Sequence, residues 1–362
     1  MMRKIGIPLG GLVLAAFFVW ITMRWFKGEL IGEAAMRLLH SPGMLVLMTA
    51  GYGLSFWLKA LSWRLYAGRE TIDPLARYIH PLFVSLLVNH VLPVKAGDLA
   101  RSGLLVRSTS IRWDDALHSV AAMRVLDMAS LLLIGSSGAL VLGLEASPLY
   151  MAVLGGALLV SAVCWRGLER LRLRERSERR TEATRELETS MLADSLSDSS
   201  LPEAERDGVQ TSRIRRAERD KAILLRHYEH LRTTLASGRG AAAALLTLAC
   251  WLLEGAVLYG VVRVLGLSVG PLQAIWVTGM TIAGQIFHIT PGGIGTYETT
   301  MTASLGVLGI AGSAAYTAAL LSHGYKFMFA FLTGAISLAM SAVTWSEMRS
   351  WLRLRKKEGQ GE

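Results

Sequence analysis

Long apolar runs constrain this chain more than any other feature, because several of them can cross a lipid bilayer. A membrane-spanning helix needs about 20 mostly apolar residues, and the 362-residue chain is 52% apolar. The runs cover residues 5–25, 43–58, 125–144, 149–165, 241–265, 272–290 and 314–343. We therefore predict an all-α, polytopic α-helical membrane protein with about eight spans, two of them re-entrant or broken. The run 43–58 is short and is expected to extend into its neighbours.

A polar insert divides the chain into two apolar halves. The predicted parts are a first transmembrane half (1–165), a charged cytoplasmic helical insert (166–240), a second transmembrane half (241–345) and a basic cytoplasmic tail (346–362). The insert is dense in Arg and Glu, which is typical of a solvated helix. A plain helical hairpin is the simpler interpretation of the insert, and binding of a cytoplasmic partner is the alternative.

The net charge of +10 comes from basic residues that gather in loops and at the ends of apolar runs. This distribution is typical of cytoplasmic loops, so no nucleic-acid partner is expected. Both chain ends and the insert are predicted to be cytoplasmic. No small-residue cleavage site follows the first run, which we interpret as a retained anchor.

One pattern occurs in both halves: His-x-x-Pro-x-x-x-Gly followed by a carboxylate. The first copy has His90, Pro93, Gly97 and Asp98, and the second has His288, Pro291, Gly295 and Glu298. Each copy interrupts an apolar segment, and paired interruptions in two halves of a membrane protein point to a transport site. An inverted repeat is one interpretation of this match.

The orientation of the chain ends adds a constraint on the first copy. An even number of crossings must separate the N-terminus from the insert, yet the first half offers five candidate segments. Segment 81–94 is the shortest of them and ends at the first Pro-Gly interruption. We predict that it is re-entrant, which requires a setting buried in protein or lining a wet cavity.

Charged residues next to the first interruption form a candidate site for an anion. Pro93 and Gly97 should break the helix, and the freed N–H groups can hold an anionic head group. Lys95 and Arg101 would add positive charge, with Asp98 orienting one of them. The cluster as a whole comprises Asn89, Pro93, Lys95, Gly97, Asp98 and Arg101. An ordinary membrane-edge loop that contacts lipid phosphates is the alternative.

Arg124 and Asp127 form a second candidate cluster at the start of an apolar run. Residues three apart share a helix face, and charges inside a membrane usually face the protein interior or a cavity. Arg124 is a candidate anion ligand that Asp127 holds in place. The alternative is a structural salt bridge.

The second half contributes the remaining candidates. Glu254 lies in an apolar run and needs a partner, for which Arg124, Lys326 and a proton are the choices. Glu298 either caps the following helix or binds an amine of the substrate. Lys326 either contacts an anion or reaches the membrane interface. The second interruption itself contributes Pro291, Gly292, Gly293 and Gly295.

Other chemistries find no support in the sequence. His and Cys do not show metal-ligand spacing, and the Gly-rich segment at 292–295 lacks the Lys-Ser/Thr end of a phosphate-binding loop. Cys164 and Cys250 both lie in apolar runs and are read as buried thiols. We expect neither a metal nor a cofactor, and no catalytic triad.

These motifs resemble those of a known family. Asn89-x-x-Leu-Pro-x-Lys-x-Gly-Asp-x-x-Arg101 is similar to the Asn-x-x-Leu-Pro-x-Arg-x-Gly-Glu-x-x-Arg signature of the lysylphosphatidylglycerol synthase transmembrane (flippase-like) family. Arg124-Val-Leu-Asp127 resembles its Glu-Arg-x-x-Asp segment, and Thr290–Glu298 resembles its Ser-Pro-Gly-Gly-x-Gly-x-x-Glu segment. The resemblance covers most of the chain except the insert. Lys replaces the usual Arg at 95, Asp the usual Glu at 98, and Met the usual Glu at 123.

The resemblance implies a multi-pass protein of the bacterial inner membrane that moves a lipid between leaflets. Its partners would be membrane lipids, either an anionic phospholipid or a polyprenyl-linked lipid. The soluble aminoacyltransferase domain of the bifunctional synthases is not in this sequence, so lysyl transfer is not expected. The alternatives are a membrane-embedded transferase that acts on polyprenyl- or phospholipid-linked substrates, and a scaffold for envelope lipids. Homo-oligomerisation is left open.

Overall fold

The computed structural model describes residues 22–68, 74–92, 96–109, 111–143, 166–167, 169–170, 173, 225, 228–285 and 290–341. Most of the predicted span 5–25, the span 149–165, most of the insert and the tail lie outside these residues. The chain divides into two compact units. The first unit comprises Met1–Glu145 and Ser237–Glu362, and the second is Ala146–Ala236. Everything below concerns the first unit.

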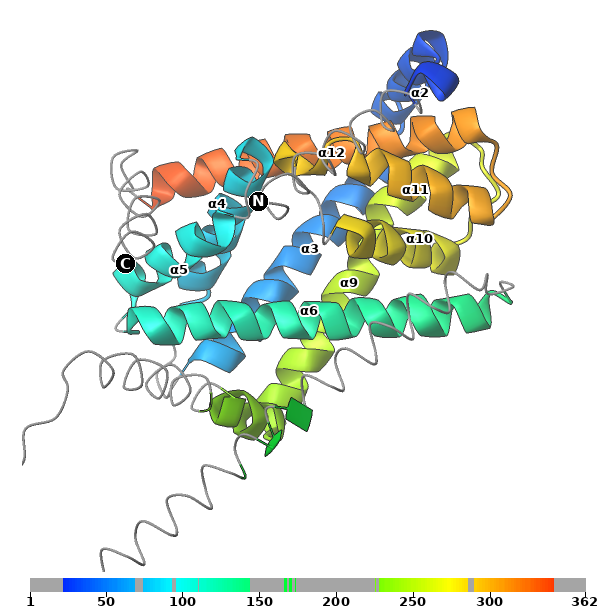
Figure 1. The fold of residues 1–362 in the computed structure, drawn as a ribbon. Helices are drawn as coiled ribbons and strands as arrows, with labels where there is room; N and C mark the ends of the chain where they lie inside the picture. The colour runs from blue at the N-terminus through cyan, green and yellow to red at the C-terminus, as the bar shows by residue number, and fades with distance from the viewer. Residues whose placement is uncertain are drawn as a thin grey trace, which may run out of the picture. The chain divides into compact units, whose positions relative to one another are not determined.

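The regular structure in the described part of the first unit is helical, which confirms the predicted all-α membrane fold (Figure 1). Its α-helices are α2 (Gly28–Leu39), α3 (Pro42–Ala67), α4 (Ala76–Val91), α5 (Gly97–Ser108), α6 (Trp113–Val141), α9 (Gly238–Val264), α10 (Pro271–Gly284), α11 (Thr296–Val307) and α12 (Gly312–Met340). A 3-10 turn, η2 (Pro291–Gly293), precedes α11.

Three of these helices, α3, α6 and α9, are long and apolar enough to cross a membrane. The predicted run 43–58 extends at its C-terminal end through Lys59 to Ala67. Pro42 opens α3 at its first turn, where a missing N–H costs nothing, and Gly68 ends it. At the start of α9 the Ser237 side chain accepts a hydrogen bond from the Gly240 N–H.

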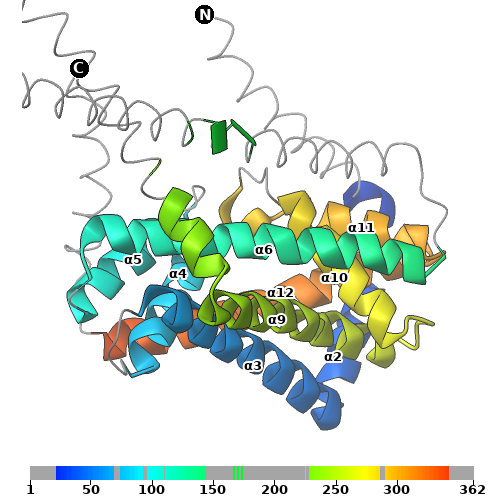
Figure 2. The same cartoon turned by 90° about the horizontal axis from the view of Figure 1, so that it is seen from below.

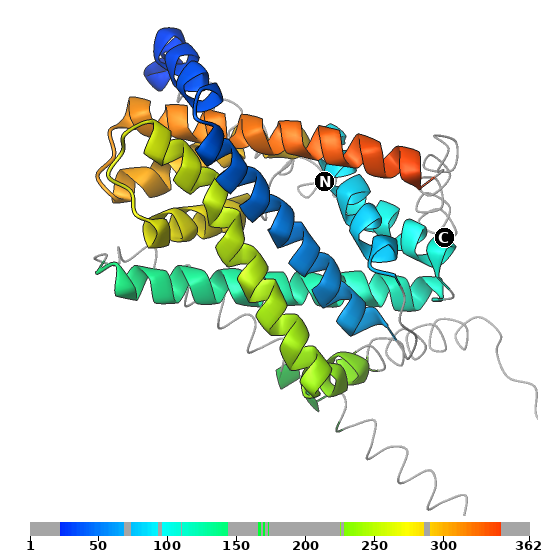
Figure 3. The ribbon, with the colours of Figure 1, turned by 180° about the vertical axis from the view of Figure 1, so that it is seen from behind.

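Helices α3 and α9 lie side by side along most of their length (Figure 3). Small residues allow this close approach, as is common between membrane helices. A Cβ atom built on Gly51 would lie 2.5 Å from the Cβ of Ala256, and one on Gly260 would lie 2.5 Å from Cγ of Met48. The largest apolar core is built around this seam and reaches into α10, α11 and α12.

Both interruptions lie between two short helices that pack on each other: α4 with α5, and α10 with α11. The four helices have 16, 12, 14 and 12 residues. At 1.5 Å per residue, each covers roughly 18–24 Å, which is less than the ~30 Å hydrocarbon core. Short paired helices are the shape that a re-entrant segment requires.

Helix α6 connects the two short-helix pairs, because it packs against α5 and against α10. The pairs lie toward opposite ends of α6 (Figure 2). Helix α12 packs on both α4 and α11, and the turn η2 contacts α4. Through this contact, the turn of the second interruption lies against the helix that leads into the first.

Candidate functional site

The first interruption is fixed by a contact between Asn89 and Gly97. The Asn89 side-chain oxygen accepts a hydrogen bond from the Gly97 N–H at 3.0 Å. A Cβ atom at position 97 would lie only 2.3 Å from the Ser85 carbonyl oxygen. Glycine is therefore required for the start of α5 to approach α4 this closely. Pro93 and Lys95, predicted for the same site, lie outside the described residues.

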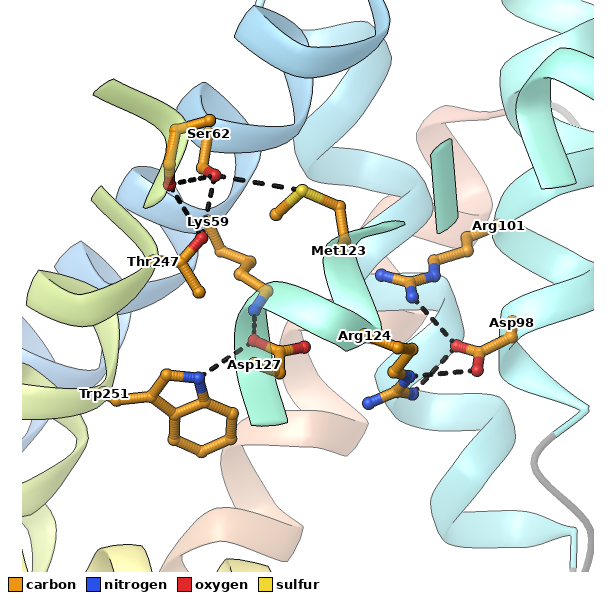
Figure 4. Close-up of polar contacts among 10 residues, drawn as sticks. Lys59, Ser62, Asp98, Arg101, Met123, Arg124, Asp127, Thr247 and Trp251 are labelled. Carbon is orange, nitrogen blue, oxygen red and sulfur yellow. Dashed lines mark hydrogen bonds and ion pairs between the residues drawn. The ribbon is translucent and has the colours of Figure 1, made fainter. Parts of the chain in front are cut away.

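Two guanidinium groups share the carboxylate of Asp98 (Figure 4). Arg124 forms a two-bond fork with it: Nη2 donates to Oδ1 at 2.8 Å, and Nε donates to Oδ2 at 3.1 Å. Nη2 of Arg101 lies 3.1 Å from Oδ1 as an ion pair. We call these three residues the arginine cluster. With two positive charges and one negative charge, it carries an excess of one positive charge.

Arg101 is the most deeply buried member of the arginine cluster, at 3% exposed. Its Nη2 is held by the ion pair with Asp98, whereas its Nε has no hydrogen-bond acceptor among the described residues. A buried donor left without an acceptor is costly, so Nε is suited to an incoming anion. The Trp63 ring lies 5.5 Å from the guanidinium carbon and provides a cation–π contact.

Asp127 does not hold Arg124, although the sequence analysis expected it to. The carboxylate of Asp127 instead accepts from Nζ of Lys59 on α3, and from Nε1 of Trp251 on α9 at 2.9 Å. The two neighbours on α6 thus point into two different groups (Figure 4). The reason is that Asp98 and Lys59, which are far from α6 in sequence, approach it from different helices.

Glu254 pairs with Lys326, one of the three partners that the sequence left open. Nζ of Lys326 donates to Oε2 of Glu254 at 2.9 Å, and both side chains are buried. Nζ also lies 5.1 Å from the centre of the Tyr52 ring and 5.7 Å from that of Tyr297. Lys326 is only 4% exposed, so it is held inside the protein and does not extend to the interface.

The second interruption is a glycine turn that Glu298 caps. Gly292, Gly293 and Gly295 have φ values of 62°, 77° and 90°, which side-chain-bearing residues rarely adopt. Oε2 of Glu298 accepts a hydrogen bond from the Gly295 N–H at 2.7 Å, at the start of α11. Capping of α11 was one of the two roles predicted for Glu298. Pro291 begins the turn.

His323 links this turn to α12. Its Nδ1 lies 2.6 Å from Oε1 of Glu298, and its Nε2 lies 3.1 Å from the Gly292 carbonyl oxygen. The carbonyl oxygen can only accept, so Nε2 of His323 donates this hydrogen bond. His323 therefore ties both the Glu298 cap and the Gly292 turn to α12.

A cavity of about 220 Å³ lies among these groups. Its walls include Asn89 and His90 from the end of α4, and Gln285 and Gly292 from either side of the second interruption. The charged side chains in its walls are Lys59, Arg101, Arg124, Asp127, Glu254 and Lys326. The cavity wall thus contains Asn89 and Arg101 of the first predicted cluster, Arg124 and Asp127 of the second, and Gly292 of the second interruption. His288 lies outside the described residues.

The fold and this cavity can be compared with known proteins. A sequence model of the family described as the lysylphosphatidylglycerol synthase TM region matches residues 9–334 of the chain. The chain belongs to this family. No curated protein and no solved structure matched it. Membership of the lysylphosphatidylglycerol synthase TM family makes it a membrane protein related to lipid modification or translocation.

Among the cavity residues of this family member that were not predicted, three form polar contacts with predicted ones: Lys59, Trp251 and His323. Lys59 lies just beyond the apolar run 43–58, so it was read as the end of that run. His323 lies three residues before Lys326, so the two share one helix face. This spacing is the sequence signal that could have identified His323. Trp251 lies in the apolar run 241–265, where a tryptophan has no distinctive pattern.

Proposed function

We propose that this protein is a lipid translocase that moves a phosphate-bearing head group between the leaflets of the bacterial inner membrane. The observation that carries the proposal is that Arg101 and Arg124 of the arginine cluster lie in the wall of the cavity. Its excess positive charge suits a phosphate oxygen, and so does the Nε of Arg101, which has no acceptor among the described residues. The acyl chains would remain in the lipid while the head group crosses.

The surroundings of the cavity support transport. Charged side chains inside a membrane protein are costly and mark pathways for ions and polar substrates. Here they lie where two interrupted helices meet, which is the usual construction of a transporter site. The N-terminus, the insert and the C-terminus would lie on the cytoplasmic side.

The cavity also favours a small head group. Its volume of about 220 Å³ lies below the roughly 300–1,000 Å³ of pockets that hold drug-sized ligands. A glycerophosphate-sized group suits this volume better than an oligosaccharide does. Among the two lipid classes that the family resemblance implies, we therefore favour an anionic phospholipid over a polyprenyl-linked glycan.

Reconstitution into liposomes tests the proposal. The purified full chain would be placed in vesicles with phosphatidylglycerol that carries a fluorophore on its acyl chain, and crossing would be followed by quenching from outside. We expect Arg124→Gln to slow crossing at least tenfold. The matched control is Arg107→Gln, which removes an exposed arginine at the end of α5. If Arg124→Gln moves lipid as fast as the control, the proposed site is wrong.

A further inference from the structure

Helix α2 lies outside the bundle, at the end where α12 begins (Figure 1). It contacts α3, α9 and α12, and its Leu38 belongs to the largest apolar core. Before α2, Trp25 closes on the first residue of α12: its Cε2 and Nε1 would lie 2.7 Å from a Cβ atom at Gly312. After α2, His40 and Ser41 lead directly into α3. Both ends of α2 are therefore tied to the first turns of long helices.

These contacts place α2 at the level of the membrane interface. Helix α3 has 26 residues and is long and apolar enough to cross a membrane. Its length of about 39 Å exceeds the ~30 Å hydrocarbon core, so its first turn lies at the edge of that core. Near this end, Met48 of α3 meets Gly260 close to the C-terminal end of α9, whereas the insert joins α9 at its start, Gly238. Helix α2 thus lies on the membrane side opposite to the start of α9.

The 12 residues of α2 form three faces with different chemistry. One face packs on the bundle through two buried residues, Ala34 and Leu38. The second face carries charge at four-residue spacing, on Glu29, Glu33 and Arg37, and the last two side chains are 66% and 64% exposed. The third face carries no charge, and we call it the open face: Gly28, Gly32, Ala35 and Leu39. Spacings of three and four residues keep each set on one side of the helix.

The open face continues beyond the helix and is strongly exposed. Leu39 is 63% exposed at its C-terminal end. At the other end, Cε1 of Phe26 lies 3.7 Å from a Cβ atom built on Gly28, and Phe26 is 55% exposed. Met36, which is 54% exposed, lies at the border between the open and the charged face. These apolar side chains need a cover that the described part of the bundle does not provide.

Neither water nor hydrocarbon alone suits this helix. Immersion in water would leave the open face as an exposed apolar patch. Immersion in the hydrocarbon core would bury the exposed charges of Glu33 and Arg37 at high cost. A short helix with separate apolar and charged faces is satisfied where it lies in the plane of the membrane interface. The exposed apolar side chains Val46 and Leu47, in the first turns of the neighbouring helix α3, continue the lipid-facing surface.

We propose that α2 is an interfacial anchor, whose partner is the surface of the lipid bilayer. The open face points toward the acyl chains, and Glu29, Glu33 and Arg37 point toward water. Two acidic residues and one basic residue give α2 little net charge, so burial of apolar surface holds it there, and attraction to anionic head groups does not. Through its contacts with α3, α9 and α12, the anchor sets the depth of these helices in the membrane. This role is independent of lipid translocation.

Site-directed fluorescence in proteoliposomes tests the anchor. The variants are Leu39→Cys on the open face and Glu33→Cys on the charged face, each in the full chain with Cys164→Ala. Cys250 is buried and is retained, and Cys164→Ala alone gives the background labelling. We expect iodide to quench a bimane label at position 39 at least threefold less than one at position 33. Lipid with a spin label near the head of its acyl chain should quench position 39 at least threefold more.

A second pair of variants, Ala35→Cys and Arg37→Cys, repeats the comparison on the same two faces if one of the first pair fails to fold. Equal quenching of the two faces, by iodide or by the lipid, would overturn the anchor. Protection from iodide at position 39 without quenching by the lipid would overturn it too, because a protein surface, such as a second copy of the chain, would then cover the open face.

The lipid composition tests which force holds the helix. The same measurements would be made in vesicles of phosphatidylcholine alone and in vesicles with added phosphatidylglycerol. We expect the same difference between positions 39 and 33 in both. Lipid quenching of position 39 that occurs only in the anionic vesicles would overturn burial of apolar surface as the cause.

Discussion

Arg124 and Asp127 lie one turn apart on α6 and bind opposite charges in two different groups. Arg124 forks onto Asp98 of α5, whereas Asp127 accepts from Lys59 of α3 and Trp251 of α9. One turn of α6 therefore connects the arginine cluster to the Lys59–Asp127 ion pair. Substitutions of the glycines at each interruption, and of the carboxylates of Asp98 and Glu298, test how these contacts hold the helices together.

Asp98→Asn should separate stability from anion affinity. The change removes the only negative charge of the arginine cluster, so the unliganded protein should lose about 1–3 kcal/mol. With Arg101 and Arg124 released, dihexanoyl phosphatidylglycerol should bind more tightly while crossing slows. Calorimetry and thermal unfolding in detergent measure the two effects. The control is Asp115→Asn, at a residue of α6 that forms a partly exposed ion pair with Arg112; it should change neither stability nor lipid affinity. Weaker lipid binding by Asp98→Asn would contradict the arginine cluster as an anion site.

Gly97→Ala should displace α5 from α4. The new Cβ would lie 2.3 Å from the Ser85 carbonyl and 2.6 Å from the Asn89 side-chain oxygen. Overpacking of this kind costs about 1–3 kcal/mol, visible as a lower unfolding temperature. Gly324→Ala on α12 is the control, because nothing lies within 4 Å of its Cβ position, and it should be neutral or slightly stabilising. Equal unfolding temperatures for the two variants would show that the contact does not constrain α5.

Gly292→Ala should lower stability for two reasons that a second change can separate. A Cβ there would lie 2.4 Å from Cζ of Phe327, and the φ of 62° is itself unfavourable for alanine. Adding Phe327→Ala removes the clash and leaves the backbone strain. In a double-mutant cycle of thermal unfolding, the clash should appear as a favourable coupling between the two changes. A coupling of zero would mean that the turn moves freely away from α12.

Glu298→Ala and His323→Ala should not have additive effects. They share one contact, and Glu298 also caps α11 through Gly295. Each single change should destabilise the protein by about 3–5 kcal/mol, as expected for a broken buried pair. The coupling energy should lie within about 0.5–3 kcal/mol, the range for residues in contact. Unfolding temperatures of the four proteins give this value, with exposed Glu33→Ala as the unaffected reference.

The sequence predicted the helices well where apolar length alone decides them. Runs 241–265 and 314–343 match α9 and α12 within a few residues at each end, because burial in lipid imposes a minimum length that can be read from the sequence. The run 43–58 was expected to extend into its neighbours, and α3 does so, from Pro42 to Ala67. A lysine ends an apolar window, but Lys59 continues α3 because Asp127 neutralises it inside the bundle.

The cavity residues were predicted better than their partners. Arg124, Asp127, Glu254 and Lys326 stood out because charges are rare in apolar runs. Their pairing depends on how helices far apart in sequence pack together, and local spacing does not contain that information. This is why Asp98 was found as a candidate but its fork with Arg124, across 26 residues, was not.

The ion pairs around the cavity also have a mechanical meaning. Lys59 with Asp127 joins α3 to α6, Lys326 with Glu254 joins α12 to α9, and Arg124 with Asp98 joins α6 to α5. Each pair is a bond between two helices as well as a pair of charges. An anion that draws a cation from its carboxylate therefore unfastens two helices at that level of the membrane. On the proposed function, the passage of a head group would therefore also loosen the packing of the helices around it.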